Sequence, residues 1–271
     1  MKPFNKLFAV YDPTQKEQPA LQRAFDVALE ISAQVHIFAC VYAHPAKPDG
    51  VAIDVEAVLA LHQAKIDEAA VAAIAGGLVV STELEWGKDW YRSVVDASAR
   101  YGADLVLKSS YRHSSGKRIF NRTSDWTLIR ECQCPVLLVK EGTQMEHRRV
   151  LCAVDINARS DSYGRLNENV ISLSKRLRDV RGAEVHFVNA FEDFKSVPSR
   201  QKLIDSCGAR SDQIHIKLGK PSKVIVDQAK RLDVSLVVVG NSARSGLSAA
   251  LVGNTAEKVL DKVVCDVLCM P

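Results

Sequence analysis

The sequence contains no long hydrophobic run. None of its apolar stretches approaches the roughly 18 residues that a transmembrane helix needs. The N-terminal run Leu7–Tyr11 has only five residues before Asp12, which is too short for the apolar region of a secretory signal. We therefore predict a cytoplasmic protein that does not associate with membranes.

The chain also has little net charge. Its 271 residues carry a formal charge of +4, and 25% of them are charged. This balance gives no reason to expect a nucleic-acid-binding surface, which needs a concentration of Lys and Arg. The hydrophobic share of 47% is typical of a globular protein, and the length suggests two domains of ordinary size.

Catalytic and metal-binding motifs are absent from the sequence. The seven cysteines include one close pair, Cys132 and Cys134, without the two-pair spacing of a structural zinc site. We expect all seven to be reduced. No Ser/His/Asp or Cys/His set has a motif context. His36 and His186 occupy equivalent strand positions, which favours packing or backbone hydrogen bonding over metal ligation. We predict no catalytic residue and no metal site.

The main organisational feature is an internal repeat. Residues 103–139 align without a gap with residues 234–270, an offset of 131 positions. The segment LFAVYD at 7–12 likewise resembles VLCAVD at 150–155, and each ends in an aspartate. We therefore predict one domain over residues 1–143 and another over residues 148–271.

Each copy alternates short runs rich in Val, Ile and Leu with segments of helical periodicity. This alternation is typical of a parallel sheet covered on both faces. The sequence thus predicts the α/β class, with two tandem, doubly wound, five-stranded parallel-sheet domains. Between its second and third strands the first copy has a long helix, whereas the second has about two helical turns opened by Pro198. The strands expected in the first copy are residues 7–11, 35–41, 79–84, 104–108 and 136–139.

The segment Val237–Leu260 reads VVVGNSARSGLSAALVGNTAEKVL. An apolar strand ends at Gly240, a glycine-spaced segment follows, and Gly253-Asn254-Thr255 opens a helical pattern. Unpaired N–H groups and the positive end of a helix dipole suit a phosphate. The alternative is an ordinary strand-to-helix turn, capped by Asn254 or Thr255.

The first copy lacks this glycine pattern. At the positions of Gly240, Gly246 and Gly253 it has Ser109, Ser115 and Arg122. Because side chains would fill the space of a phosphate there, the first copy is predicted to keep the fold without the site.

With these segments, the chain resembles a tandem universal stress protein. Nucleotide-binding members of that family carry a glycine, two residues, a second glycine, nine residues, a third glycine and then Ser or Thr. Gly240 matches the first glycine and Gly253 the third, whereas Ala243 stands at the middle position and Asn254 at the hydroxyl position. Residues 124–140 further resemble the E type of tandem member. The resemblance implies a pseudo-dimer within the chain, paired through the two last strands.

The resemblance also implies individual roles. Asp155 would contact the adenine or ribose end of a nucleotide, and Arg244, which has no family role, is well placed for phosphate oxygens. The alternatives are that Asp155 caps its own segment and that Arg244 is a solvated surface residue. The predicted binding set is Ala153, Asp155, Ala190, Val239, Gly240, Arg244, Gly246, Gly253, Asn254 and Thr255.

Two hypotheses for function follow. In the first, the chain is a non-enzymatic stress-response module whose second domain binds ATP, with Mg, or another phosphoryl ligand. Slow ATP hydrolysis is left open, although the glycine segment lacks the Lys-Ser/Thr ending of a Walker motif. In the second, the chain does not bind ATP and acts without a ligand or with a lipid-like one. The sequence names no protein partner and leaves association into a homodimer open.

Overall fold

The computed structural model describes residues 2–42, 53–111, 118–142, 149–158, 161–241 and 255–271, without the side chains of residues 118–124 and 162. The chain forms two compact units, Lys2–Glu141 and Gly142–Pro271, and each is described by itself. In the described part, no helix combines the length and the apolar character needed to cross a membrane.

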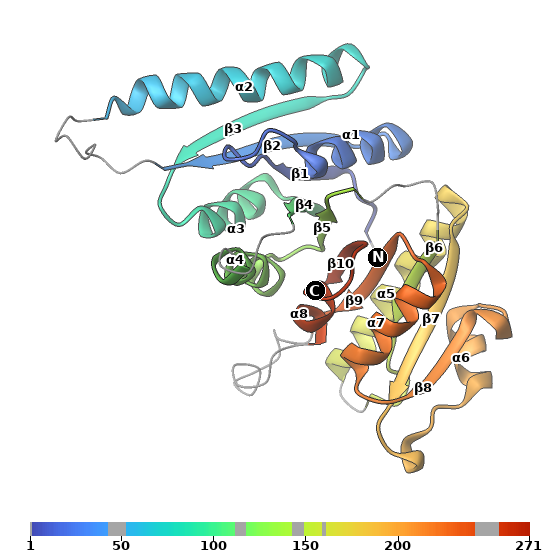
Figure 1. Ribbon diagram of the computed structural model, residues 1–271. Helices are drawn as coiled ribbons and strands as arrows, with labels where there is room; N and C mark the ends of the chain where they lie inside the picture. The colour runs from blue at the N-terminus through green and yellow to red at the C-terminus, as the bar shows by residue number, and fades with distance from the viewer. Residues whose placement is uncertain (1, 43–52, 112–117, 143–148, 159–160, 242–254) are drawn as a thin grey trace. The chain divides into compact units, whose positions relative to one another are not determined.

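The first unit alternates strands and helices throughout (Figure 1). Its elements are β1 (Lys6–Val10), α1 (Pro19–Ile31), β2 (Gln34–Val41), α2 (Val55–Ala75), β3 (Val80–Trp86), α3 (Trp90–Tyr101), β4 (Leu105–Ser110), α4 (Arg118–Glu131) and β5 (Val136–Lys140).

The second unit repeats this order with a shorter segment after its second strand. Its elements are β6 (Arg149–Ala153), α5 (Asp161–Arg181), β7 (Glu184–Phe191), the 3-10 turn η1 (Phe194–Ser196), α6 (Arg200–Cys207), the 3-10 turn η2 (Ser211–Gln213), β8 (Ile214–Leu218), α7 (Pro221–Leu232), β9 (Leu236–Gly240), α8 (Thr255–Leu260) and β10 (Asp266–Met270). Helix α6 begins after Pro198 rather than at it, because Ser199 is the N-cap and its Oγ accepts a hydrogen bond from Lys202 N at 3.3 Å.

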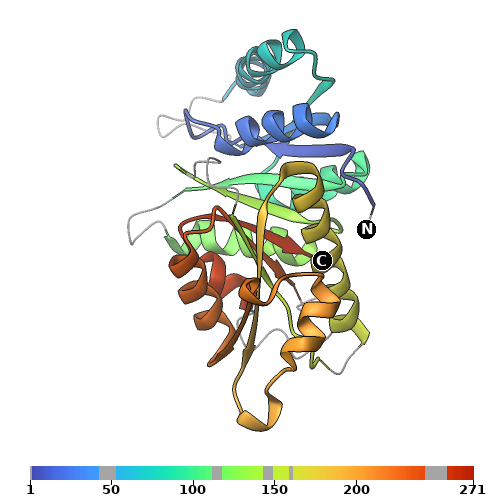
Figure 2. The ribbon, with the colours of Figure 1, turned by 90° about the vertical axis from the view of Figure 1, so that its right-hand side faces the viewer.

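Both units contain a five-stranded parallel sheet. The strand order is β3-β2-β1-β4-β5 in the first and β10-β9-β6-β7-β8 in the second. Right-handed connections with this order place the first two helices of a unit on one face and the last two on the other. Figure 2 shows this for the second unit, with α5 and α6 on one side of the strands and α7 and α8 on the other. The predicted fold is confirmed, and the pairing of the two last strands stays a prediction.

The central strands form the core of each unit. Phe8 and Ile37 in the first unit and Leu151 and Phe187 in the second are fully buried. Strands covered on both faces need continuous apolar sequence, which explains the uninterrupted runs that made them recognisable. The sheet therefore holds the carboxyl ends of its strands in fixed positions, and these ends carry the residues considered next.

The first helices of the two units differ in length. Gln18 of the first unit exchanges two hydrogen bonds with the backbone of Asp12, at 2.7 and 2.9 Å. Asn167 of the second unit makes the same exchange with Asp155, at 2.6 and 3.0 Å. Gln18 directly precedes α1, whereas Asn167 lies inside α5, which begins at Asp161. Helix α5 therefore has nearly two additional N-terminal turns.

Histidines occupy matching positions on the second strand of each unit. His36 stacks on Tyr101 with ring centroids 4.5 Å apart, so the expected packing is confirmed for this residue. The hydrogen bonds go to side chains rather than to the backbone. His36 contacts Ser81 and Glu83 at 2.8 and 3.1 Å, and His186 contacts His215 at 3.1 Å.

The His186–His215 pair makes the second unit sensitive to acid. Burial, together with the charges of His186, Lys217, Arg231 and Arg200, lowers the pKa of His215 to about 4. The unfolded chain takes up this proton below about pH 6.5 and the folded chain does not. The free energy of unfolding should therefore fall by about 1–2 kcal/mol between pH 6.5 and 4, after allowance for the partial exposure of the ring.

Urea unfolding of the wild type and of His215→Gln at pH 7 and pH 5 tests this expectation. The variant should lose less stability on acidification, because it removes the proton that only the unfolded chain binds. Carboxylates such as Glu184, whose pKa is lowered below its usual value by Arg149 and His186, are present in both proteins, so the difference between the two losses reports on His215. Equal losses in both proteins would contradict the prediction.

Candidate ligand-binding site of the second unit

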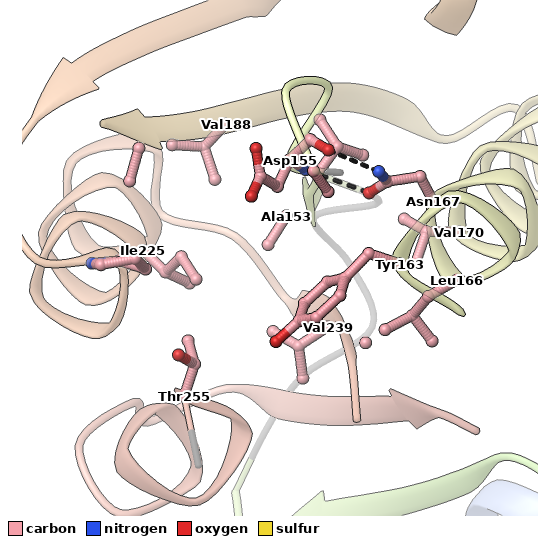
Figure 3. Close-up of a pocket in the computed structure, with 15 residues that line it drawn as sticks. Ala153, Asp155, Tyr163, Leu166, Asn167, Val170, Val188, Ile225, Val239 and Thr255 are labelled. Carbon is pink, nitrogen blue, oxygen red and sulfur yellow. Dashed lines mark hydrogen bonds between the residues drawn. The ribbon is translucent and has the colours of Figure 1, made fainter. Parts of the chain in front are cut away.

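A cavity of about 500 Å³ lies at the carboxyl ends of the strands of the second unit. The ends of β6, β7 and β9 form its floor, and α5, α7 and α8 contribute its walls (Figure 3). Strand β6 pairs with β7 on one side and β9 on the other. The loops that follow β6 and β9 therefore run to opposite sides of the sheet. Such a switch point is where open α/β sheets bind ligands, and the volume is in the range of small-molecule sites.

Asp155 follows β6, and hydrogen bonds to its backbone N and O atoms hold it in place. Asn167 accepts a hydrogen bond from Asp155 N and donates one to Asp155 O, and Asp155 Oδ1 accepts one from Asn157 N at 3.2 Å. Figure 3 shows the carboxylate directed into the cavity, away from Asn167. Asp12 of the first unit accepts the matching bond from Thr14 N at 2.9 Å. Both aspartates therefore cap their own segments, and in Asp155 this leaves the side chain facing the cavity.

The structure brings together every predicted site residue that it describes. The cavity lining includes Ala153, Asp155, Ala190, Val239, Gly240 and Thr255. Arg244, Gly246, Gly253 and Asn254, together with Ala243, lie outside the described residues. That any of these residues contacts a ligand stays a prediction.

Helix α5 supplies lining residues that the sequence analysis missed. Tyr163, Leu166, Asn167 and Val170 all face the cavity, and in Figure 3 the ring of Tyr163 reaches from α5 toward the middle of it. The spacing of Tyr163, Leu166 and Val170 is that of one helix face. This spacing can be read from the sequence and predicts a helix. It does not predict that the helix begins earlier, relative to its unit, than α1 does.

Leu166 lies against the backbone of Gly240. A Cβ atom placed on Gly240 would be 2.3 Å from Leu166 Cδ2 and 2.4 Å from Leu166 Cγ. No side chain fits at that separation, so a glycine is required at the end of β9 as long as Leu166 stays where it is. Gly240, which was predicted to lie against a ligand, is in contact with Leu166.

The described lining is mainly apolar. Its side chains include Val188, Ile225 and Val239, and Asp155 is the one charged residue among the described lining residues. Pro221 and Thr255, the first residues of α7 and α8, also line the cavity. The cavity therefore suits an uncharged, partly aromatic ligand group with hydrogen-bond donors for the carboxylate.

In the first unit, larger side chains occupy the corresponding positions. With the repeat offset of 131 residues, Trp90 stands for Pro221, Lys108 for Val239 and Ser109 for Gly240. Ser109 Oγ accepts a hydrogen bond from Ala20 N at 3.0 Å. Lys108 Nζ lies 5.4 Å from the centroid of the Trp90 ring. These contacts give a physical reason for the predicted loss of the site in the first copy.

The lysine in this cluster is part of a buried ion pair. Lys108 Nζ lies 2.6 Å from Asp125 Oδ1 and donates a hydrogen bond to Ser109 O at 2.9 Å. Asp125 Oδ2 accepts a hydrogen bond from Ser110 Oγ at 3.3 Å. The side chains of Lys108 and Asp125 are 10% and 9% exposed, so solvent screens their charges little.

All seven cysteines are free. Burial raises the pKa of the Cys152 thiol, and it raises that of Cys207 to about 11. Such thiols are protonated near neutral pH and are poor nucleophiles. Among the described residues, no group of three or more His, Cys, Asp or Glu side chains could hold a metal ion.

Fold and site together define a tandem α/β protein with a cavity at the strand ends of its second unit. The model of the universal stress protein family matches residues 3–140 and 206–271. The chain therefore belongs to the universal stress protein family, and the sequence-based resemblance is confirmed. Strands β6 and β7 and helix α5 lie outside the matched residues.

Several known proteins are similar to nearly the whole chain. Universal stress protein E of Escherichia coli (strain K12) is 28% identical over 99% of this chain and 94% of its own length. A putative universal stress protein from Pseudomonas aeruginosa UCBPP-PA14 has a TM-score of 0.80 and 26% identity, covering 98% of this chain and 93% of its own. A universal stress protein from Archaeoglobus fulgidus DSM 4304 shares the fold, with a TM-score of 0.77 at 17% identity over 98% and 96% of the two chains.

Proposed function

We propose that this chain acts in the stress response as a binding protein rather than an enzyme, and that its second unit binds an adenine nucleotide or a related ligand. Family membership supports the stress-response role. The observation that carries the ligand proposal is the cavity at the β6 switch point, lined by all six described residues of the predicted binding set. The proposed ligands include ATP, with Mg, and other phosphoryl compounds.

Calorimetric titration of ligand-stripped protein with adenosine, AMP and Mg-ATP tests the proposal. We expect saturable binding of at least one of these probes, with one site per chain. Because a ligand that binds only the folded state stabilises it, the same probe should raise the melting temperature. The absence of both heat and stabilisation for all three probes would overturn the proposal.

A substitution that fills the cavity should abolish this binding. Ala190 lies near the carboxyl end of β7 and lines the cavity. Ala190→Phe therefore places an aromatic ring in the space proposed for the ligand. Leu218→Phe adds the same group on the neighbouring strand β8, at an exposed position outside the lining. Loss of binding in Ala190→Phe alone is expected, whereas unchanged binding in both variants would place the ligand elsewhere.

The apolar lining supports a second candidate, an apolar or lipid-like ligand in the same cavity. This candidate predicts no response to ATP and a molecule that copurifies with the protein. Mass spectrometry of the denatured, freshly purified protein separates the two candidates, because a copurified amphiphile that Ala190→Phe no longer carries would support the second.

A further inference from the structure

We infer that Leu166 is a specificity-determining residue of the cavity, and that it makes the site favour a nucleoside over a nucleoside triphosphate. This inference rests on the proposed function and names the ligand class of the same site. Three observations carry it: the contact of Leu166 with Gly240, the additional turns of α5, and the charge of the cavity lining.

The contact decides what can reach the end of β9. Leu166 occupies the space directly over Gly240, within 2.4 Å of the position that a Cβ atom would take there. A phosphate chain that approached the Gly240 backbone would have to occupy the same space. The glycine therefore accommodates Leu166 on the side where a Cβ atom would lie, and Leu166 limits the approach of a phosphate chain to the strand end from that side.

The additional turns of α5 put Leu166 in that place. Asn167 of α5 matches Gln18, the residue before α1, through the same pair of hydrogen bonds. Every residue of α5 before Asn167 therefore has no helical counterpart in the first unit. There, the residue in the position of Gly240 is Ser109, and it bonds to the backbone of Ala20 in the first turn of α1. The leucine is thus a feature of the second unit, at the site that this unit has kept.

The charge of the cavity lining also favours a nucleoside over a nucleoside triphosphate. Asp155 directs its carboxylate into the cavity (Figure 3) and is the one charged residue among the described lining residues. A carboxylate repels phosphate oxygens across a few ångströms. It accepts hydrogen bonds from the amino and hydroxyl groups of a nucleoside. The apolar walls at Val188, Ile225 and Val239 suit the face of a purine ring.

The experiment compares adenosine with Mg-ATP on the wild type, Leu166→Ala and Leu173→Ala by calorimetry. Leu173 lies on the same helix and is buried, but it does not line the cavity, so it controls for loss of a leucine side chain. We expect the wild type to bind adenosine at least as tightly as Mg-ATP. Leu166→Ala should shift the affinity ratio toward Mg-ATP by about tenfold, and Leu173→Ala should leave the ratio unchanged.

A second measurement tests the contact without any ligand. Gly240→Ala should lower the melting temperature by about 3–10 °C through overpacking, and Leu166→Ala in the same chain should recover part of that loss. A Gly240→Ala protein as stable as the wild type would overturn the inference. So would a wild type that prefers Mg-ATP about tenfold, or a ratio that Leu166→Ala does not change.

Failure of the proposed function gives a different result. If adenosine, AMP and Mg-ATP all fail to bind to any of the proteins, the proposed function is overturned and the selectivity with it. Recovery of stability in the double variant would then show that Leu166 and Gly240 form a packing contact only.

Discussion

Replacing Asp125 by alanine is expected to destabilise the first unit by about 3–5 kcal/mol. The substitution leaves the Lys108 ammonium buried beneath Trp90, without the carboxylate that lies 2.6 Å away. A buried charge without a partner is among the most costly defects in a folded protein. Lys108 keeps its hydrogen bond to Ser109 O and its contact with the Trp90 ring, but both partners are neutral and compensate only in part.

Urea unfolding followed by tryptophan fluorescence measures this effect. The informative control removes both charges, as in Lys108→Met with Asp125→Leu. Replacement of a buried ion pair by apolar residues of similar volume is often neutral or stabilising, so the double variant should unfold close to the wild type. A small loss in Asp125→Ala, or an additive loss in the double variant, would show that Lys108 and Asp125 are not coupled.

The fold was largely predictable from the sequence. The strands were recognisable because both faces of each sheet are covered, which demands unbroken apolar runs such as residues 37–41 and 236–239. The repeat made the prediction stronger, since the same order of segments occurred twice. The start of α6 was misplaced by two residues because Ser199, rather than Pro198, forms the N-cap.

The floor of the cavity was predictable for the same reason. Ala153, Ala190 and Val239 lie at or near strand ends, and parallel strands bring their carboxyl ends to one edge. The wall formed by α5 was not predictable, because it depends on where α5 begins. Asn167, inside α5, bonds to the backbone of Asp155, twelve residues earlier, and no local sequence pattern predicts such a contact.

The sequence predicted that the two units diverge, but it did not predict the burial of Lys108. Lys108 stands in the run DLVLK, where a lysine after apolar residues suggests a strand end reaching solvent. The structure buries it instead, because Asp125, 17 residues later, supplies the opposite charge. A charge in a buried strand needs a distant partner, and a pair at that separation is recognised only when the fold is known.

The Lys108–Asp125 pair can be transplanted to test whether it is what distinguishes the units. Its counterparts at the repeat offset are Val239 and Ala256, which are 1% and 0% exposed. Val239→Lys alone buries an unpaired ammonium in the floor of the cavity and should cost at least about 3 kcal/mol of unfolding free energy. Adding Ala256→Asp supplies the carboxylate from α8 and should recover about 2 kcal/mol or more, which a double-mutant cycle measures.

The same double variant should no longer bind ligand, because the lysine stem fills the space over β9 that the wild-type valine leaves open. If the double variant remains stably folded, the loss of binding is due to occlusion of the cavity rather than to unfolding.

The single variant Ala256→Asp completes the cycle, and it should be destabilised too, since its carboxylate is buried without a cation. If the two changes are additive, the second unit lacks the geometry of the first at these positions. If they are coupled but binding persists, the lysine stem does not close the cavity, and the closure of the first unit rests on Trp90 and Ser109.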